Sequence, residues 1–353
     1  MSLLHSNRTA ANPQAPRLDG LRPRAAIPGG SFEVTGSRLL ARADNLQQLP
    51  SARFGETAAS FDLARANRAT VRVPEGAISS DLVFEVDGHI SNVLHASVGV
   101  PLAENLHLIS NPAVDGNGNI FAMVSGARGD RVPVSVFRID ADLQVRPFVR
   151  DLLNVSALAF DSAGFLYASS RAEGAVYRIS PEGEIATFAE GMGVATGLAF
   201  DREGNLFVGD RSGTIFKINP DRQIFVFATL EPSVAAYHLA FRDDGTLLVS
   251  APSTLSRHPL YAIDPDGTIS MFFHGLGRPQ GMALDVQGNV YVAASLGGWR
   301  GIVRIAPDGH DAELFISGND LVGLCFLDDG CAALATGNTL YHVDLGIEGR
   351  PLL

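Results

Sequence analysis

A short motif recurs along the chain from residue 108 onward, and it limits the possible folds more than any other feature. One copy runs Gly-Leu-Ala-Phe-Asp-Arg-Glu-Gly-Asn-Leu-Phe-Val from Gly197, and another runs Gly-Met-Ala-Leu-Asp-Val-Gln-Gly-Asn-Val-Tyr-Val from Gly281. The turn glycines of the copies are 46, 40, 41, 43 and 42 residues apart, and they are Gly118, Gly164, Gly204, Gly245, Gly288 and Gly330. A period of about 40–50 residues is typical of the four-stranded blades of a β-propeller.

Each copy predicts four short strands. An apolar segment such as 198–200 leads into an Asp-x-x-Gly turn, and the strands 206–208, 215–218 and 224–227 follow it. The six copies therefore predict a six-bladed propeller over residues 96–353. The last copy lacks a clear fourth strand, and an open ring would leave an unpaired edge. We expect residues 96–100 to supply that strand and to close the ring.

The segment 16–95 carries a different pattern. Short alternating strands at 30–36, 70–74 and 81–87 are separated by turns rich in glycine and proline. This pattern and length predict an immunoglobulin-like β-sandwich. Residues 1–15 are polar and contain proline, so we expect them to be disordered. The predicted fold class is all-β, with a sandwich followed by a six-bladed propeller.

Composition excludes several partners. The chain of 353 residues has 27 basic and 38 acidic side chains, a net charge of −11, which disfavours nucleic acid as a partner. No apolar run approaches the roughly 20 residues of a membrane-spanning helix.

The first residues lack the apolar core of a signal peptide, which predicts a cytoplasmic protein, or a secreted one if the natural chain begins further upstream. The two cysteines, Cys325 and Cys331, are expected to be buried thiols.

Both parts of the chain resemble known families. The N-terminal part is similar to IPT/TIG domains in segments 28–30, 34–36, 52–55, 71–74 and 83–86. That resemblance implies a spacer, adhesion or dimerisation module. The repeated Gly-Leu-Ala-Phe-Asp-x-x-Gly-Asn-Leu-Phe-Val resembles the NHL / SMP-30–gluconolactonase group of six-bladed propellers. The group includes metal-dependent lactonases, lyases and interaction platforms, so the resemblance implies the fold more narrowly than the activity.

Loop lengths indicate which face of the propeller carries a site. The Asp-x-x-Gly and Pro-Asp-Gly turns are short and uniform, whereas the loops that enter each first strand and leave each second strand vary in length. Variable loops on a rigid scaffold are where binding sites concentrate. We therefore expect a ligand at the channel mouth on the variable face. The residues that enter the first strands there are Ser110, Ser156, Thr196, Tyr237, Gln280 and Val322.

The side chains of this ring determine whether it can bind a metal ion. In metal-dependent lactonases of the SMP-30 group, the corresponding ring supplies an Asn and an Asp, with a Glu from the first blade. Here Thr196 and Gln280 stand at the Asn and Asp positions, and the ring holds no carboxylate. Neutral oxygens alone bind divalent cations poorly. We expect no metal cofactor; the alternative is one divalent cation such as Ca or Zn, held by another loop.

Several residues depart from the repeat's own pattern and are candidate site residues. His238 stands where other copies have a small residue or Asn111, and it could act as a general base or bind a ligand. Asp210 could orient it, or it could pair with a neighbouring arginine. The remaining candidates for ligand binding are Asn111 beside the ring, Arg171 and Arg211 for an anion, Tyr237 and Trp299 for stacking, and His258 in a long loop. For each of them, packing or surface exposure is the alternative.

Two functions are compatible with these residues. The first is a non-enzymatic propeller that binds a small molecule, a glycan or a protein, with the N-terminal module as a spacer or contact surface. The second is a gluconolactonase-like hydrolase or a virginiamycin-B-lyase-like lyase, with His238 as base and Asp210 as the group that orients it. The ring without carboxylates favours the first.

Overall fold

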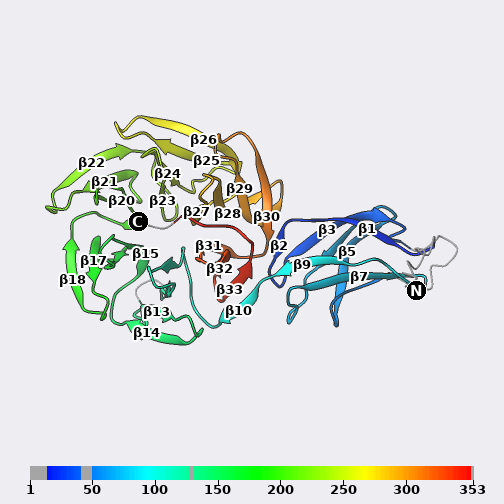
Figure 1. The fold of residues 1–353 in the computed structure, drawn as a ribbon. Coiled ribbons are helices and arrows are strands. Elements are labelled where there is room, and N and C mark those ends of the chain that lie inside the picture. Colours follow the sequence, from blue (N-terminus) through cyan, green and yellow to red (C-terminus); the bar gives the residue numbers. More distant parts are fainter. Residues whose placement is uncertain (1–13, 41–49, 127–129, 351–353) are drawn as a thin grey trace, which may run out of the picture. The chain divides into compact units, whose positions relative to one another are not determined.

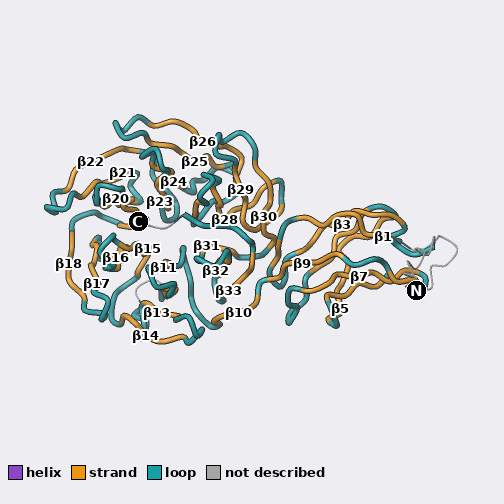
Figure 2. The backbone as a smooth tube through the Cα atoms, viewed as in Figure 1, coloured by secondary structure: helices purple, strands orange, loops and turns teal. Residues whose placement is uncertain are grey.

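The computed structural model describes residues 14–40, 50–126 and 130–350. Every regular element in these ranges is a β-strand (Figure 2), which confirms the all-β class. No helix in the described ranges has the length and hydropathy needed to cross a membrane. The chain divides into two compact units, and the boundary lies between Val98 and Gly99. Residues 1–13, most of the segment that we expect to be disordered, lie outside the described residues.

The described residues of the first unit, 14–40 and 50–98, form nine strands. They are β1 (Arg17–Arg22), β2 (Ala25–Ala26), β3 (Ser31–Ser37), β4 (Ser51–Phe54), β5 (Thr57–Arg65), β6 (Arg68–Arg72), β7 (Ser80–Val86), β8 (His89–Ile90) and β9 (Leu94–Val98). β3 pairs with β1 and β6, and β7 pairs with β4 and β9, all antiparallel. β5 connects the two groups, because its first residues pair with β4 and its later residues with β6.

One hydrophobic core fills this unit. Phe32 and Val71 come from the strand group around β3, and Phe54 and Phe84 come from the group around β7. All four side chains are buried in a single cluster, as the alternation of apolar residues along the strands predicts. The core explains why the unit is compact. The assignment of the unit to the immunoglobulin-like sandwiches, and to IPT/TIG domains among them, stays a prediction.

The second unit contains the remaining strands, coloured from cyan to red in Figure 1. They are β10 (Val100–Ala103), β11 (Ala113–Val114), β12 (Ile120–Met123), β13 (Val136–Ile139), β14 (Val145–Val149), β15 (Val155–Phe160), β16 (Leu166–Ser170), β17 (Ala175–Ile179), β18 (Ile185–Ala189), β19 (Ala195–Phe200), β20 (Leu206–Asp210), β21 (Thr214–Ile218), β22 (Ile224–Thr229), β23 (His238–Phe241), β24 (Leu247–Ser250), β25 (His258–Ile263), β26 (Ile269–Leu276), β27 (Met282–Leu284), β28 (Val290–Leu296), β29 (Trp299–Ile305), β30 (Ala312–Ser317), β31 (Leu321–Phe326), β32 (Cys331–Thr336) and β33 (Leu340–Asp344).

These strands form a propeller arrangement. Five separate four-stranded sheets have the orders β11-β12-β13-β14, β15-β16-β17-β18, β19-β20-β21-β22, β23-β24-β25-β26 and β10-β33-β32-β31. β27 to β30 pair in the same order, but their sheet extends beyond four strands. The prediction of a six-bladed propeller is therefore corrected to five blades. The innermost strands β11, β15, β19, β23, β27 and β31 contact one another in cyclic order around a central channel.

The strand that completes the last sheet differs from the predicted one by a few residues. β10 pairs antiparallel with β33, with Val100 opposite His342. The predicted closing segment was 96–100. Ala96 and Val98 instead belong to β9 and are buried in the core of the first unit, which removes them from the propeller. Closure by a strand that precedes the first copy is thus found, but with Val100–Ala103.

The phenylalanine and the aspartate of the repeated motif each have a structural role. Its phenylalanine packs edge-on against an aromatic ring of the preceding sheet, as in Tyr167–Phe200 and Phe207–Phe241, with centroids 4.9 Å apart. Its aspartate closes the turn: one oxygen of Asp201 accepts a hydrogen bond from the Asn205 backbone N–H, and the other accepts one from the Asn205 amide, each at 2.8 Å. The Asp-x-x-Gly-Asn sequence therefore stabilises the turn between the first and second strands of a copy.

Candidate functional site

The channel of the second unit encloses a cavity of about 400 Å³. Its wall comes from the innermost strands and is mainly apolar: Leu158, Ala159, Phe160, Leu198, Ala199, Phe200, Leu239, Ala240, Phe241, Met282, Ala283, Leu284, Cys325 and Phe326. These are the small and apolar residues that the motif repeats in each copy, so the repeat itself builds the wall. At one end the lining includes Asn111, and at the other it includes the turn residues Asp115 and Asp161.

The cavity thus reaches the face of the propeller that carries the Asp-x-x-Gly turns. Asp328 in the corresponding turn of the last sheet also lines it, together with Gly349 and Arg350 from the segment after β33. Loop variability predicts a ligand on the opposite face. The uniform turns that sequence reasoning treated as purely structural therefore also form the rim of the cavity.

His238 lies on the variable-loop side of the channel, and its side chain is buried. Its ring Nδ1 is 3.2 Å from the Ser110 hydroxyl, which lies ahead of β11. The residue is 6% exposed, and burial lowers the pKa of His238 to about 4. The imidazole is therefore neutral near pH 7, and it joins two sheets that are not neighbours. Neither residue is among the residues that line the cavity.

Asn111 lines the cavity at the end opposite to the Asp-x-x-Gly turns. Its amide donates to the Met282 carbonyl at 2.6 Å, and its carbonyl oxygen accepts from the Leu324 backbone N–H at 3.2 Å. Gly281 and Gly323 leave the space for it, because a Cβ on either would lie 1.9 or 2.4 Å from the Asn111 oxygen. Gly281 and Gly323 are thus required by close packing around the Asn111 side chain.

The Asp210 carboxylate stabilises the loop before β19 and the loop after β20 by hydrogen bonds. Its carboxylate accepts hydrogen bonds from the Val194 backbone N–H at 3.0 Å and from the Ser212 hydroxyl at 2.8 Å. In the described part of the chain, no hydrogen bond or ion pair joins Asp210 to His238 or to an arginine. The expected pair of a base and the carboxylate that orients it is therefore not assembled.

Four other predicted site residues take part in hydrogen bonds within the propeller. Tyr237 is fully buried, its hydroxyl donates to the Glu231 carbonyl, and burial raises its pKa to about 12. Thr196 accepts from the Tyr237 backbone N–H at 3.1 Å and donates to a carbonyl of β20 at 2.8 Å. The Ser156 hydroxyl, on β15, donates to the Asn154 carbonyl just before that strand. Gln280 uses its backbone in two hydrogen bonds, one with β28 and one with Ser250.

The remaining predicted residues lie apart from one another. Arg171 donates to the Ser125 hydroxyl at 3.2 Å, and Arg211 donates to the Val234 carbonyl at 3.1 Å, so each has its own partner. Trp299 is 46% exposed at the turn between β28 and β29. His258 is buried and accepts from the Ser253 backbone N–H at 3.1 Å; burial, followed by the charge of Arg278, lowers its pKa.

This donor set does not fit a divalent cation at the channel mouth. The resemblance to the gluconolactonase group implies a metal held by the ring that includes Ser110, Ser156, Thr196 and Gln280. The hydroxyls of Ser156 and Thr196 donate to backbone carbonyls, the Ser110 hydroxyl contacts His238, and the ring supplies no carboxylate. Ca²⁺ requires several oxygen ligands, usually with carboxylates among them.

Sequence reasoning missed Arg350. Its backbone N–H donates to the Leu284 carbonyl at 2.9 Å, and its guanidinium donates to the Phe241 carbonyl at 2.7 Å. A second nitrogen is 2.8 Å from Asp243, and the side chain is only 14% exposed. Arg350 thus fastens the segment after β33 across β27 and β23 at the rim of the cavity. It lies outside the repeat, so no repeat position pointed to it.

Comparison with known proteins identifies the fold. No protein-family model matches the chain, and no curated protein sequence matches it. A candidate gluconolactonase of known structure is 18% identical with a TM-score of 0.60, over 72% of this chain and 93% of that one. A streptogramin B lyase is 12% identical with a TM-score of 0.53, over 69% and 96%.

A further similar structure spans both units. An auxiliary nutrient binding protein from Bacteroides thetaiotaomicron is 11% identical with a TM-score of 0.57, and the match covers 94% of this chain and 98% of that one. Identities this low show a common fold and nothing more specific. The chain is an all-β protein with the β-propeller fold, similar to proteins described as binding proteins, lactonases and lyases.

Proposed function

We propose that this protein binds a small, largely apolar molecule in the channel cavity of its propeller. The observation that carries the proposal is the apolar wall around about 400 Å³ of space, to which all six innermost strands contribute. Known ligand pockets have volumes of about 300–1,000 Å³ and are lined mainly by apolar residues. The wall favours a small apolar molecule over a glycan, because a glycan needs many polar partners.

The overall organisation supports a binding role. The Bacteroides protein described as nutrient binding matches both units of this chain. We infer that the first unit is an immunoglobulin-like module of IPT/TIG type that acts as a spacer or contact surface. The second unit would be an NHL / SMP-30-like propeller that holds the ligand.

A fluorescent probe tests this proposal directly. N-phenyl-1-naphthylamine is apolar, neutral and bright only in apolar surroundings, so the wild-type protein should show saturable fluorescence. Ala199→Phe adds a ring to the cavity wall and should abolish the signal, while Thr187→Phe on β18, an exposed strand position away from the cavity, should retain it. Equal signals from the two variants, or no saturable signal from the folded wild type, would overturn the proposal.

A second candidate is a hydrolase or lyase that uses His238. The observation that favours it is the distance of 3.2 Å between the His238 ring and the Ser110 hydroxyl, because an imidazole beside a hydroxyl can activate a nucleophile. The burial of His238 and its low pKa oppose this function, since a base works best with a pKa near the working pH.

Turnover of a lactone panel distinguishes the two functions. Catalysis by this pair requires that His238→Gln and Ser110→Ala both abolish turnover while the fold persists, as measured by circular dichroism. A binding protein gives no turnover above buffer with any lactone, and its probe binding persists in both variants because neither residue lines the cavity.

A further inference from the structure

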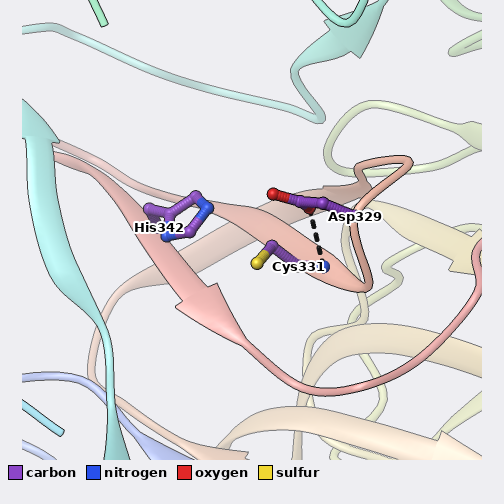
Figure 3. A group of neighbouring side chains, drawn as sticks. All are labelled: Asp329, Cys331 and His342. Atoms are coloured by element: carbon purple, nitrogen blue, oxygen red, sulfur yellow. Dashed lines mark hydrogen bonds between the residues drawn. The ribbon is translucent and has the colours of Figure 1, made fainter. Parts of the chain in front are cut away.

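Three side chains of different chemistry converge on the sheet that contains β31, β32 and β33. Asp329 lies in the turn between β31 and β32, Cys331 begins β32, and His342 lies within β33 (Figure 3). In the strand register, Cys331 is opposite Asp344, and His342 is opposite Ala333. Residues two apart in a strand share a face, and so do directly opposite residues. Cys331, His342 and Asp344 therefore lie on one face of the sheet.

The potential ligand atoms of the three residues are close together. One atom from each of Asp329, Cys331 and His342 lies within 4.8 Å of the other two. One Asp329 oxygen accepts from the Cys331 backbone N–H at 3.0 Å, which fixes the carboxylate beside the thiol (Figure 3). The His342 ring makes no hydrogen bond to any residue in the described ranges. Its two nitrogens are thus available to a ligand.

The surroundings of the thiol are anionic. The pKa of the Cys331 thiol is raised to about 12, first by burial and then by the hydrogen bond and charge of Asp329 and the charge of Asp344. Asp329 is exposed, His342 is half-buried and Cys331 is buried. Two carboxylates therefore act on one buried sulfur, and within residues 14–40, 50–126 and 130–350 no arginine or lysine is among the groups that affect it.

We propose that Asp329, Cys331 and His342 bind a zinc ion. Zinc combines sulfur, imidazole nitrogen and carboxylate oxygen in one site, whereas Ca²⁺ and Mg²⁺ take oxygen ligands. A tetrahedral zinc site holds its ligand atoms about 3.5 Å apart. The side chains of Asp329 and His342 must therefore move inward by about 1 Å, which their exposure permits. Asp344 or a water molecule would complete the four ligands.

Zinc binding at this place would join the turn after β31 to the last strand of the unit. The Cys331 thiol loses its proton to solvent as the sulfur–zinc bond forms. None of the three residues lines the channel cavity, so this site is independent of the proposed ligand site. Because β33 also pairs with β10, the ion would stabilise the sheet that closes the propeller.

Cobalt provides the most direct test. The protein is first freed of metals with a chelator and then titrated with Co²⁺. A thiolate bound to Co²⁺ gives a charge-transfer band in the near ultraviolet, which reports binding. Zinc affinity is then measured by competition of Zn²⁺ with the bound Co²⁺. We expect one ion per chain in the wild type. Cys331→Ser and His342→Gln should each weaken zinc binding by more than about tenfold.

The second cysteine supplies a matched control. Cys325→Ser changes a buried thiol that lines the channel, and it should leave the cobalt band and the zinc affinity unchanged. If Cys331→Ser does not fold by circular dichroism, the half-buried His342→Gln variant decides the result alone. Absence of a saturable site in the wild type would overturn the proposal, and so would a band that survives in folded Cys331→Ser.

Discussion

The His238 ring and the Ser110 hydroxyl meet 3.2 Å apart in the channel, although 128 residues separate them in the chain. His238 begins β23 and Ser110 precedes β11, and these strands belong to sheets that are not neighbours. A hydrogen bond across the ring fixes the distance between opposite sides of the propeller. It therefore contributes to the stability of the propeller.

Removal of the hydroxyl tests this bridge. Ser110→Ala leaves a buried imidazole without its partner, so we expect a loss of about 1–3 kcal/mol in the free energy of unfolding. Urea denaturation measures the loss. In a His238→Leu background the same substitution should cost much less, because the polar partner is already gone. Equal losses in the two backgrounds would show that the contact contributes nothing.

The pH dependence of stability follows from the buried imidazole. The pKa of His238 is about 4 in the folded protein, below its ordinary value of 6.5, so the unfolded chain binds more protons between these values. Stability should therefore fall as the pH drops from 6.5 toward 4, by about 2 kcal/mol between pH 7 and pH 5. Urea midpoints at these two pH values give the change. His238→Gln should lack this contribution, and an identical pH dependence in the variant would contradict it.

Arg350 should hold the segment after β33 on the propeller. Arg350→Ala removes the hydrogen bond to Phe241 and the ion pair with Asp243, so the amides of residues 345–350 should exchange hydrogen with solvent at least about tenfold faster. Hydrogen exchange followed by mass spectrometry measures the rate. The matched control is Arg202→Ala, which removes an exposed partner of the same Asp243 and should have little effect.

Asn111 should be sensitive to loss of its amide. Asn111→Ala leaves the Met282 carbonyl and the Leu324 N–H without a partner and opens space beside Gly281 and Gly323. We expect a loss of about 2–4 kcal/mol in the free energy of unfolding, measured in urea. Asn117→Ala, in the exposed turn that follows, should change stability by less than about 0.5 kcal/mol. A loss of similar size in both variants would contradict the role of Asn111.

The sequence predicts the strands well because each copy of the motif is a local pattern. The turn glycines and the small residues of the inner strands follow from it, whereas the strand that pairs with β33 is Val100–Ala103 and not the predicted segment 96–100. The repeat also singles out His238 and Asp210 as departures, and both are unusual in the structure: one bridges the channel and the other fastens a loop. Their departure from the pattern did not indicate which chemistry each would serve.

What the sequence does not predict depends on contacts between distant segments. The cavity arises only when the innermost strands surround the channel, and Arg350 reaches its rim from outside the repeat. Cys331 and His342 are brought together by the pairing of β32 with β33, and they match no local metal-binding motif. Register across a sheet decides such clusters, and register is fixed by the fold as a whole.

The pairing of β10 with β33 has a consequence for synthesis and folding of the chain. A ribosome delivers β10 long before β33 exists, so the edge of β10 waits without its partner until nearly the whole second unit has been made. Pairing over such a sequence distance is slow, because the intervening chain must be ordered first. The last sheet should therefore be the final one to form, and chaperones that shield β10 would act most usefully in that interval.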